Sequence, residues 1–307
     1  MRKIFLSALL LLLLGNLQAQ NTPAFEEIIY GRKDGVALTM LELKPAGNAK
    51  GKAIIHVVAG SWFSSYAQAT SKANLETTKQ LYLDRGYTVF EVIVGSQPRF
   101  AIPDQISDVK RVVRYIRYNA KTFGIDPDHI GIEGYSAGGH LSLAVATADE
   151  KIDTASKDPV DHVSLRVQAV AVLFPPTDFL NWAPFGNIIN NKAILLPNGV
   201  FGAVDFKKWN NKTKTYDEIS DTAERNKIGR EISPIYSITS DDPPVFIIHG
   251  DADPVVPLQQ SQTIIAKFKE AGVINNYIIK KGGKHNFDDM QPEVSTEFPQ
   301  WFDKYLK

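Results

Sequence analysis

IGIEGYSAGGHLSLAV, residues 130–145, places Ser136 between Gly134 and Gly138. The apolar run before the serine is typical of a buried strand, and the run after it is typical of a helix. Glycines on both sides indicate a corner so sharp that side chains at the flanking positions would clash. The serine hydroxyl is therefore expected where the strand turns into the helix, beside N–H groups that favour developing negative charge.

A serine hydroxyl at such a corner needs a partner, because it is a weak nucleophile until a base takes its proton. That base is usually a histidine oriented by a carboxylate, and on this kind of corner the carboxylate and then the histidine follow the serine along the chain. The segment VFIIHGDADPVVPLQQS, residues 245–261, predicts a buried strand and a turn with Asp251 and Asp253. Only His285, in the glycine-rich loop KKGGKHNF, lies beyond that turn. The pattern predicts Ser136 as nucleophile, His285 as base, and either aspartate as the acid.

Strand and helix patterns alternate along most of the chain. A strand pattern at 53–58 comes before the serine motif, and the clearest helix is expected over 103–123, where apolar residues recur at three- and four-residue steps. A last helix is expected over 292–306. This alternation predicts an α/β fold with a mostly parallel sheet that helices cover on both faces.

One long segment interrupts the alternation. Residues 175–242 are too many for a simple crossover, and 13 of the 27 residues from 205 to 231 are charged. We expect a polar insertion over about 180–232, at the edge of the sheet where ligands bind in open α/β folds. It is expected to form either a cap or a long surface loop within a single domain, residues 20–307.

The N-terminus has the layout of a secretory signal peptide. Arg2 and Lys3 precede an apolar run over 4–14, and small residues end at Ala19. The apolar run would reach roughly 16 Å as a helix, about half of a bilayer core, so no stable membrane insertion is expected. We predict a signal peptide over residues 1–19 and a secreted or periplasmic protein.

Composition excludes several classes of function. The chain has 307 residues with 34 basic and 34 acidic side chains, and this balance disfavours nucleic acid as a partner. It has no cysteine, which excludes a thiol nucleophile, disulfides and cysteine-based metal sites. The serine chemistry needs no cofactor or metal, and none is expected.

Three motifs together carry a family resemblance: GIDPDHIGIEGYSAGGHLS, SPIYSITSDDPPVFIIHGDADPVVPLQQS and GKHNF. From about residue 26 to its end the chain resembles the α/β-hydrolase family. Within it the chain resembles the esterase/lipase group, close to the bifunctional acetylxylan/feruloyl esterases of the BD-FAE type. The resemblance implies an α/β-hydrolase fold with a central sheet of about eight strands and the polar insertion before the strand that carries the acid.

The resemblance also implies which aspartate is the acid. The family has the acid at the second Asp of an H-G-x-x-D-x-x-V-P pattern, which His249 to Pro257 match here with Asp253. Ser136 and His285 match the family's nucleophile and base.

The loop after the strand at 53–58 departs from the family pattern. The family usually has H-G-G-G-W there, whereas this chain has Val58-Ala-Gly-Ser-Trp62. The resemblance implies oxyanion donors at the backbone N–H groups of Gly60, Ser61 and Ala137. Loss of one such donor typically costs about 2.7–4 kcal/mol of transition-state stabilisation. Trp62 and Tyr135 are the expected substrate-binding side chains.

These observations predict a secreted serine esterase that acts through an acyl-enzyme. Export and the resemblance imply short-chain or aromatic acyl esters of small molecules or polysaccharides, with acetyl or feruloyl groups on plant polysaccharides as the specific expectation. A prolyl oligopeptidase-like serine peptidase is one alternative, although such enzymes usually carry an additional propeller domain. A catalytically impaired hydrolase-fold binding protein is the other, because the oxyanion loop is altered.

Overall fold

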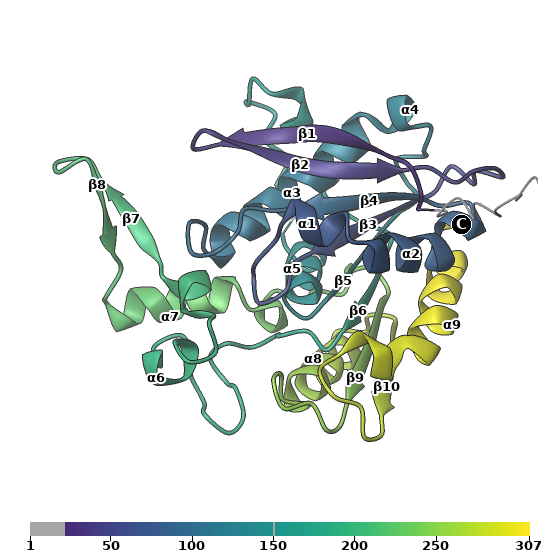
Figure 1. The fold of residues 1–307 in the computed structure, drawn as a ribbon. Helices are drawn as coiled ribbons and strands as arrows, with labels where there is room; N and C mark the ends of the chain where they lie inside the picture. Colours follow the sequence, from purple (N-terminus) through teal and green to yellow (C-terminus); the bar gives the residue numbers. More distant parts are fainter. Residues whose placement is uncertain (1–21, 150) are drawn as a thin grey trace, which may run out of the picture.

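Eight short strands form the central sheet of the protein (Figure 1). The computed structural model describes residues 22–149 and 151–307. The strands are β1 (Phe25–Lys33), β2 (Val36–Leu43), β3 (Ala53–Val58), β4 (Thr88–Ile93), β5 (Ile130–Tyr135), β6 (Ala169–Leu173), β9 (Val245–Gly250) and β10 (Asn275–Lys280). They lie in the order β1-β2-β4-β3-β5-β6-β9-β10, and within this sheet β1–β2 and β2–β4 are the antiparallel pairs. The predicted mostly parallel sheet of about eight strands is therefore confirmed.

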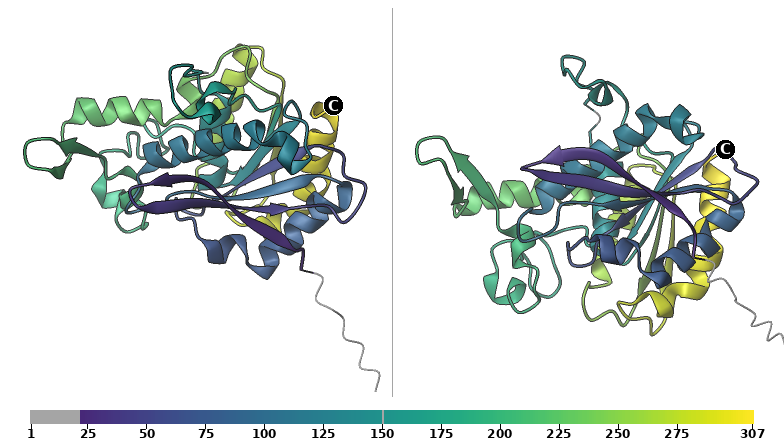
Figure 2. Two further views of the ribbon diagram at one scale, coloured as in Figure 1. Left: turned by 90° about the horizontal axis from the view of Figure 1, so that it is seen from above. Right: turned by 45° about the horizontal axis from the view of Figure 1, so that its top comes forward.

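Helices cover both faces of the sheet (Figure 2). One face carries α2 (Lys72–Leu81) and α9 (Phe287–Tyr305), and the other carries α3 (Ile102–Tyr118), α5 (Ala137–Ala146) and α8 (Gln259–Glu270). Every residue of β3 and of β9 is buried. Burial of one Val, Leu or Ile side chain contributes about 1.5–3 kcal/mol. The near-continuous apolar strands therefore specify a core on each side of the sheet.

The predicted signal peptide, residues 1–19, lies outside the described residues. In the part of the chain that is described, we find no helix with both the length and the apolar character needed to cross a bilayer. Export of the protein therefore stays a prediction from the sequence.

The helix expected over 103–123 is broken into two. The α3 helix ends at Tyr118, and a short helix α4 (Ala120–Phe123) follows. At the break, the side-chain amide of Asn119 donates to the Tyr115 carbonyl at 2.8 Å. This local bond competes with continued helix, which apolar periodicity alone does not reveal.

The last helix begins earlier than the expected range 292–306. It starts at Phe287, because the side chain of Asn286 accepts the N–H of Asp289 at 2.8 Å as an N-cap. Pro292 then lies inside the helix and does not begin it. The placement matters for the site, because His285 directly precedes the cap.

The insertion folds into elements of its own. These are α6 (Lys192–Leu195), β7 (Lys207–Asn210), β8 (Thr215–Glu218) and α7 (Thr222–Glu231), and in Figure 1 they extend to the left of the sheet. Arg225 is 5% exposed, and its guanidinium donates to the carbonyls of Ile189, Val204 and Ile219. A buried arginine thus joins several parts of a segment that is rich in surface charge.

The corner between β5 and α5 leaves no room for side chains at its glycines. A Cβ on Gly134 would lie 2.4 Å from the carbonyl carbon of Gly138, and one on Gly138 would lie 2.2 Å from the Val57 carbonyl oxygen. The Gly138 N–H also donates to the Ala59 carbonyl at 3.0 Å. Because these neighbours are backbone atoms, they cannot give way as a flexible side chain would. The glycines are therefore required for β5, α5 and the loop after β3 to meet.

We predict that Gly134→Ala lowers the free energy of unfolding by about 1–3 kcal/mol or more, because the added methyl overpacks backbone. Urea denaturation followed by circular dichroism measures this. Gly47→Ala is the matched control, since a Cβ there would meet nothing within 4 Å. Equal unfolding midpoints for wild type and Gly134→Ala would contradict the packing argument.

Candidate active site

Three side chains from separate strand ends form one hydrogen-bonded line. Nε2 of His285 lies 2.9 Å from the Ser136 hydroxyl, and Nδ1 of His285 lies 2.7 Å from Oδ2 of Asp253. Since a carboxylate can only accept, Nδ1 carries the proton and Nε2 is free to accept the serine proton. The structure thus brings together the three residues that the sequence predicts as nucleophile, base and acid.

Hydrogen bonds fix the buried carboxylate of Asp253. Its Oδ1 accepts the N–H groups of Val255 and Val256 at 2.8 and 2.9 Å. Its Oδ2 also lies 3.3 Å from Nε2 of His249. Burial alone would raise the pKa of Asp253, but the bonds with His249 and His285 outweigh it and hold this pKa below its ordinary value. The group therefore stays ionised throughout the neutral range.

The alternative acid, Asp251, is used elsewhere. Its Oδ1 accepts the N–H of Gly282 at 2.6 Å, and its own N–H donates to the Lys280 carbonyl at 3.0 Å. It therefore shapes the turn at the end of β9 and β10. Of the two aspartates in the motif, Asp253 is the one bonded to His285.

Ser136 has a backbone conformation that is rare for a serine. Its φ of 52° and ψ of −118° place it outside the regions that residues with a Cβ normally adopt. Its N–H donates to the Leu173 carbonyl at the end of β6, at 3.0 Å. Phe174, the next residue, packs its ring 4.2 Å from the His285 ring. The end of β6 thus supports both the nucleophile and the base.

The loop after β3 corrects one predicted oxyanion donor. The Gly60 N–H donates to the Phe63 carbonyl at 2.9 Å, and the Phe63 N–H returns a bond to Gly60 at 2.8 Å. The Gly60 amide is therefore committed to its own turn and is not a free donor. Ser61 has a φ of 50°, and neither its N–H nor that of Ala137, the first residue of α5, has a partner among the described residues.

Trp62 does not have the predicted place. Its side chain is 6% exposed and packs against Phe179, and its Nε1 donates to Nδ1 of His140 at 3.1 Å. His140 in turn donates from Nε2 to the Ile232 carbonyl at 2.7 Å, and burial lowers its pKa to about 4. The neutral imidazole thus joins the loop after β3 to α5 and to the end of the insertion. The structure does not support the prediction that Trp62 binds substrate, because its ring is buried in the core.

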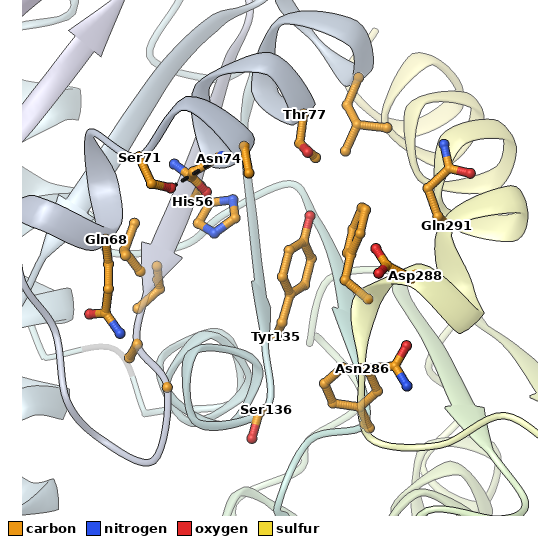
Figure 3. A pocket seen from close by; sticks show the side chains of 18 of the residues that line it. His56, Gln68, Ser71, Asn74, Thr77, Tyr135, Ser136, Asn286, Asp288 and Gln291 are labelled. Atoms are coloured by element: carbon orange, nitrogen blue, oxygen red, sulfur yellow. Dashed lines mark hydrogen bonds between the residues drawn. The ribbon is translucent and has the colours of Figure 1, made fainter.

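Tyr135, the other predicted substrate contact, lies in a large cavity beside the serine. This cavity of about 900 Å³ begins at Ser136 and His285 and runs between α2 and α9. We call it the α2–α9 groove. Figure 3 shows Tyr135 on its floor, pointing away from Ser136 toward Thr77. The phenol ring lies between His56, at 5.0 Å, and Phe287, at 5.3 Å.

Several residues that hold the site carry no motif. Side-chain amides of Gln97 and Gln105 donate to the carbonyls of Ser61 and Trp62, and so fix the backbone of the loop after β3. His249 accepts from Ser261 and donates to the Val256 carbonyl, which holds it against Asp253. Glutamines of this kind give no pattern in a sequence, whereas His249 belongs to the recognised H-G-x-x-D segment.

Comparisons with known proteins agree with this fold. A solved structure described as a truncated form of a carbohydrate esterase from gut microbiota superposes with a TM-score of 0.71 and 27% identity, covering 94% of this chain and 98% of that one. An acetyl ester-xyloside bifunctional hydrolase from Caldicellulosiruptor lactoaceticus has a TM-score of 0.66 and 22% identity, over 93% and 96% of the two chains. At 22% identity, the likeness to the second structure shows a shared fold.

Sequence comparisons extend the likeness to curated proteins. Esterase LipQ of Mycobacterium tuberculosis is 26% identical over 236 residues, which are 76% of this chain and 50% of LipQ. An acetylxylan esterase of Xylanibacter ruminicola is 30% identical over 146 residues, which are 48% of this chain and 28% of that protein. The chain spans about half the length of the curated relatives it matches. The BD-FAE family model matches residues 41–268, well over half of the chain, and the protein therefore belongs to the BD-FAE family of α/β-hydrolases.

Proposed function

We propose that this protein is a serine carboxylesterase. The observation that carries the proposal is the bonded line from Asp253 through His285 to Ser136, at the mouth of the α2–α9 groove. The relatives that the chain matches are named as esterases and a carboxylic ester hydrolase, which supports the same class of reaction.

The chemistry follows from the proton positions. Oγ of Ser136 attacks the ester carbonyl carbon as its proton passes to Nε2 of His285, and the negatively charged oxygen is held by the N–H groups of Ser61 and Ala137. The tetrahedral intermediate then expels the alcohol, which takes the proton from His285 and leaves the acyl group on the serine. Water repeats the sequence with His285 again as base, and the acid product leaves. The carboxylate of Asp253 stays ionised and stabilises the imidazolium of His285 in both steps.

The specific substrate we propose is an acetyl or aromatic acyl ester on a plant polysaccharide, met outside the cytoplasm. The acetylxylan esterase among the relatives supports the substrate class, and the apolar N-terminal run supports export. The insertion favours short over long acyl chains, because it is densely charged from 205 to 231 and offers a poor surface for lipid.

We predict that the protein hydrolyses acetylated xylan, methyl ferulate or p-nitrophenyl acetate. Ser136→Ala should lower kcat about 10⁵- to 10⁶-fold, to the residual activity that the oxyanion donors and substrate binding supply. Ester hydrolysis measured in parallel on both proteins tests this. Wild type that turns over none of these esters while binding xylan would instead support a binding protein.

The choice of acid gives a second prediction. Asp253→Asn should lower kcat about 10⁴-fold, because an asparagine favours the wrong tautomer of His285. Asp251→Asn is the matched control, and it should stay within a few-fold of wild type because Asp251 bonds only backbone of the turn. The assignment fails if Asp251→Asn is the more damaged of the two.

Acyl length gives a third prediction. The ratio kcat/KM should fall from p-nitrophenyl acetate through butyrate to palmitate, because the densely charged segment from 205 to 231 is a poor surface for desolvating a long acyl chain. Initial rates measured for the three esters at equal enzyme concentration give the order of their kcat/KM values. A preference for palmitate would overturn the short-chain assignment.

A further inference from the structure

The α2–α9 groove is far larger than an acetyl group requires. Its volume of about 900 Å³ is in the range of pockets that enclose whole small ligands. It opens at His285 and is also lined by the following residues Asn286 and Phe287. Because the leaving alcohol takes its proton from Nε2 of His285, the alcohol portion of an ester is the part that lies at this opening.

The walls of the groove are almost uncharged, and their polar side chains are set in a larger apolar surface. Among the described residues that line it there is no lysine or arginine, and beside the triad histidine and His56 the one charged side chain is the exposed Asp288. The polar side chains are amides and hydroxyls from three helices, as Figure 3 shows for those it labels: Gln68, Ser71, Asn74, Thr77, Gln291 and Ser295. A wall of this kind matches a ligand that carries hydroxyl groups and no net charge.

Some of this bonding capacity is unused. The Thr77 hydroxyl is half-buried and has no partner among the described residues. The side-chain amide of Asn74 bonds the Ala69 carbonyl, at 3.1 Å, and the Glu91 carboxylate, which leaves its Oδ1 as an acceptor. A buried polar group without a partner costs about 1–3 kcal/mol, so a ligand that supplies partners here gains affinity.

One buried histidine and two buried glutamates lie at the floor of the groove. On three adjacent strands, His56 of β3 lies in register with Glu91 of β4 and Glu133 of β5. Nδ1 of His56 bonds Oε1 of Glu133 at 2.9 Å, and Tyr82 and Thr78 donate to Glu133 and Glu91. Burial alone would lower the pKa of His56, but the two carboxylates outweigh it and raise this pKa to about 9. The carboxylates of Glu91 and Glu133 thus compensate the positive charge of His56. The floor therefore has no surplus positive charge to attract an anionic ligand.

From these features we infer that the α2–α9 groove binds the alcohol portion of the ester, that this portion is an uncharged, hydroxyl-rich ring such as a neutral sugar, and that Thr77 and Asn74 determine the preference for it. The inference rests on the proposed esterase function. It assigns specificity to the walls of the groove between two helices and not to the insertion.

Two acetate esters of similar size test the inference: a monoacetylated methyl pentopyranoside, whose ring carries hydroxyls, and cyclohexyl acetate, whose ring carries none. Acetate release gives kcat and KM for each ester. Wild type should prefer the sugar ester. Thr77→Val, which removes a hydroxyl and keeps the side-chain shape, and Asn74→Leu should each lower the preference about threefold to tenfold, as loss of one hydrogen bond does. The loss should appear in KM for the sugar ester alone.

The control is Thr122→Val on α4, an exposed threonine outside the groove, which makes the same chemical change and should leave both esters unaffected. Unchanged ratios in Thr77→Val and Asn74→Leu, with both esters still hydrolysed, would overturn the groove assignment and leave the esterase function standing. A wild-type protein no more active than Ser136→Ala on either ester would overturn the proposed function and the inference with it.

Discussion

The site depends on a corner that the backbone of Ser136 would not adopt by itself. A serine at φ 52° and ψ −118° is held in a sparsely populated region at a cost of about 1–3 kcal/mol. Contacts made by its neighbours offset that cost. Its N–H is bonded to the end of β6, and the Gly138 N–H is bonded to the loop after β3. The corner is thus stabilised by parts of the sheet that lie far apart in sequence, and it presents the hydroxyl toward the base.

The same principle places the other two members of the line. The turn after β9 and the loop after β10 are joined by a bond from the Ala252 N–H to the Gly283 carbonyl at 3.0 Å, and a Cβ on Gly250 would lie 2.0 Å from that carbonyl oxygen. Because parallel strands end at one edge of the sheet, these loops converge next to the serine. The carboxylate, the imidazole and the hydroxyl therefore meet through the topology of the sheet, with little reliance on local sequence.

This explains which features the sequence predicts well. The glycines around Ser136 report a local steric need and periodic apolar runs report burial, so the fold, Ser136 and His285 could be predicted from the residues. The choice of Asp253 over Asp251 needed the family resemblance. The oxyanion loop could not be predicted. In that loop Gly60 pairs with Phe63 and the ring of Trp62 turns inward. Gln97 and Gln105 bond the backbone of the loop, and His140 accepts from Trp62. All three partners come from other elements.

The helix boundaries at Asn119 and Asn286 cannot be predicted from apolar periodicity for a similar reason, since one side-chain bond decides each of them. The α2–α9 groove has no sequence motif, because its residues come from α1 (Tyr66–Ala69), α2, α9, two strands and the loops between elements.

We propose that the fold converts the ordinary hydroxyl of Ser136 into a nucleophile. Treatment with a fluorophosphonate, followed by peptide mapping by mass spectrometry, tests it most directly, because such a probe reacts with an activated serine and spares unactivated ones. Our account predicts a single adduct on the peptide that contains Ser136, formed slowly or not at all when His285 is replaced by alanine. Equal labelling of folded wild-type and Ser136→Ala protein, or an adduct confined to another residue, would contradict it.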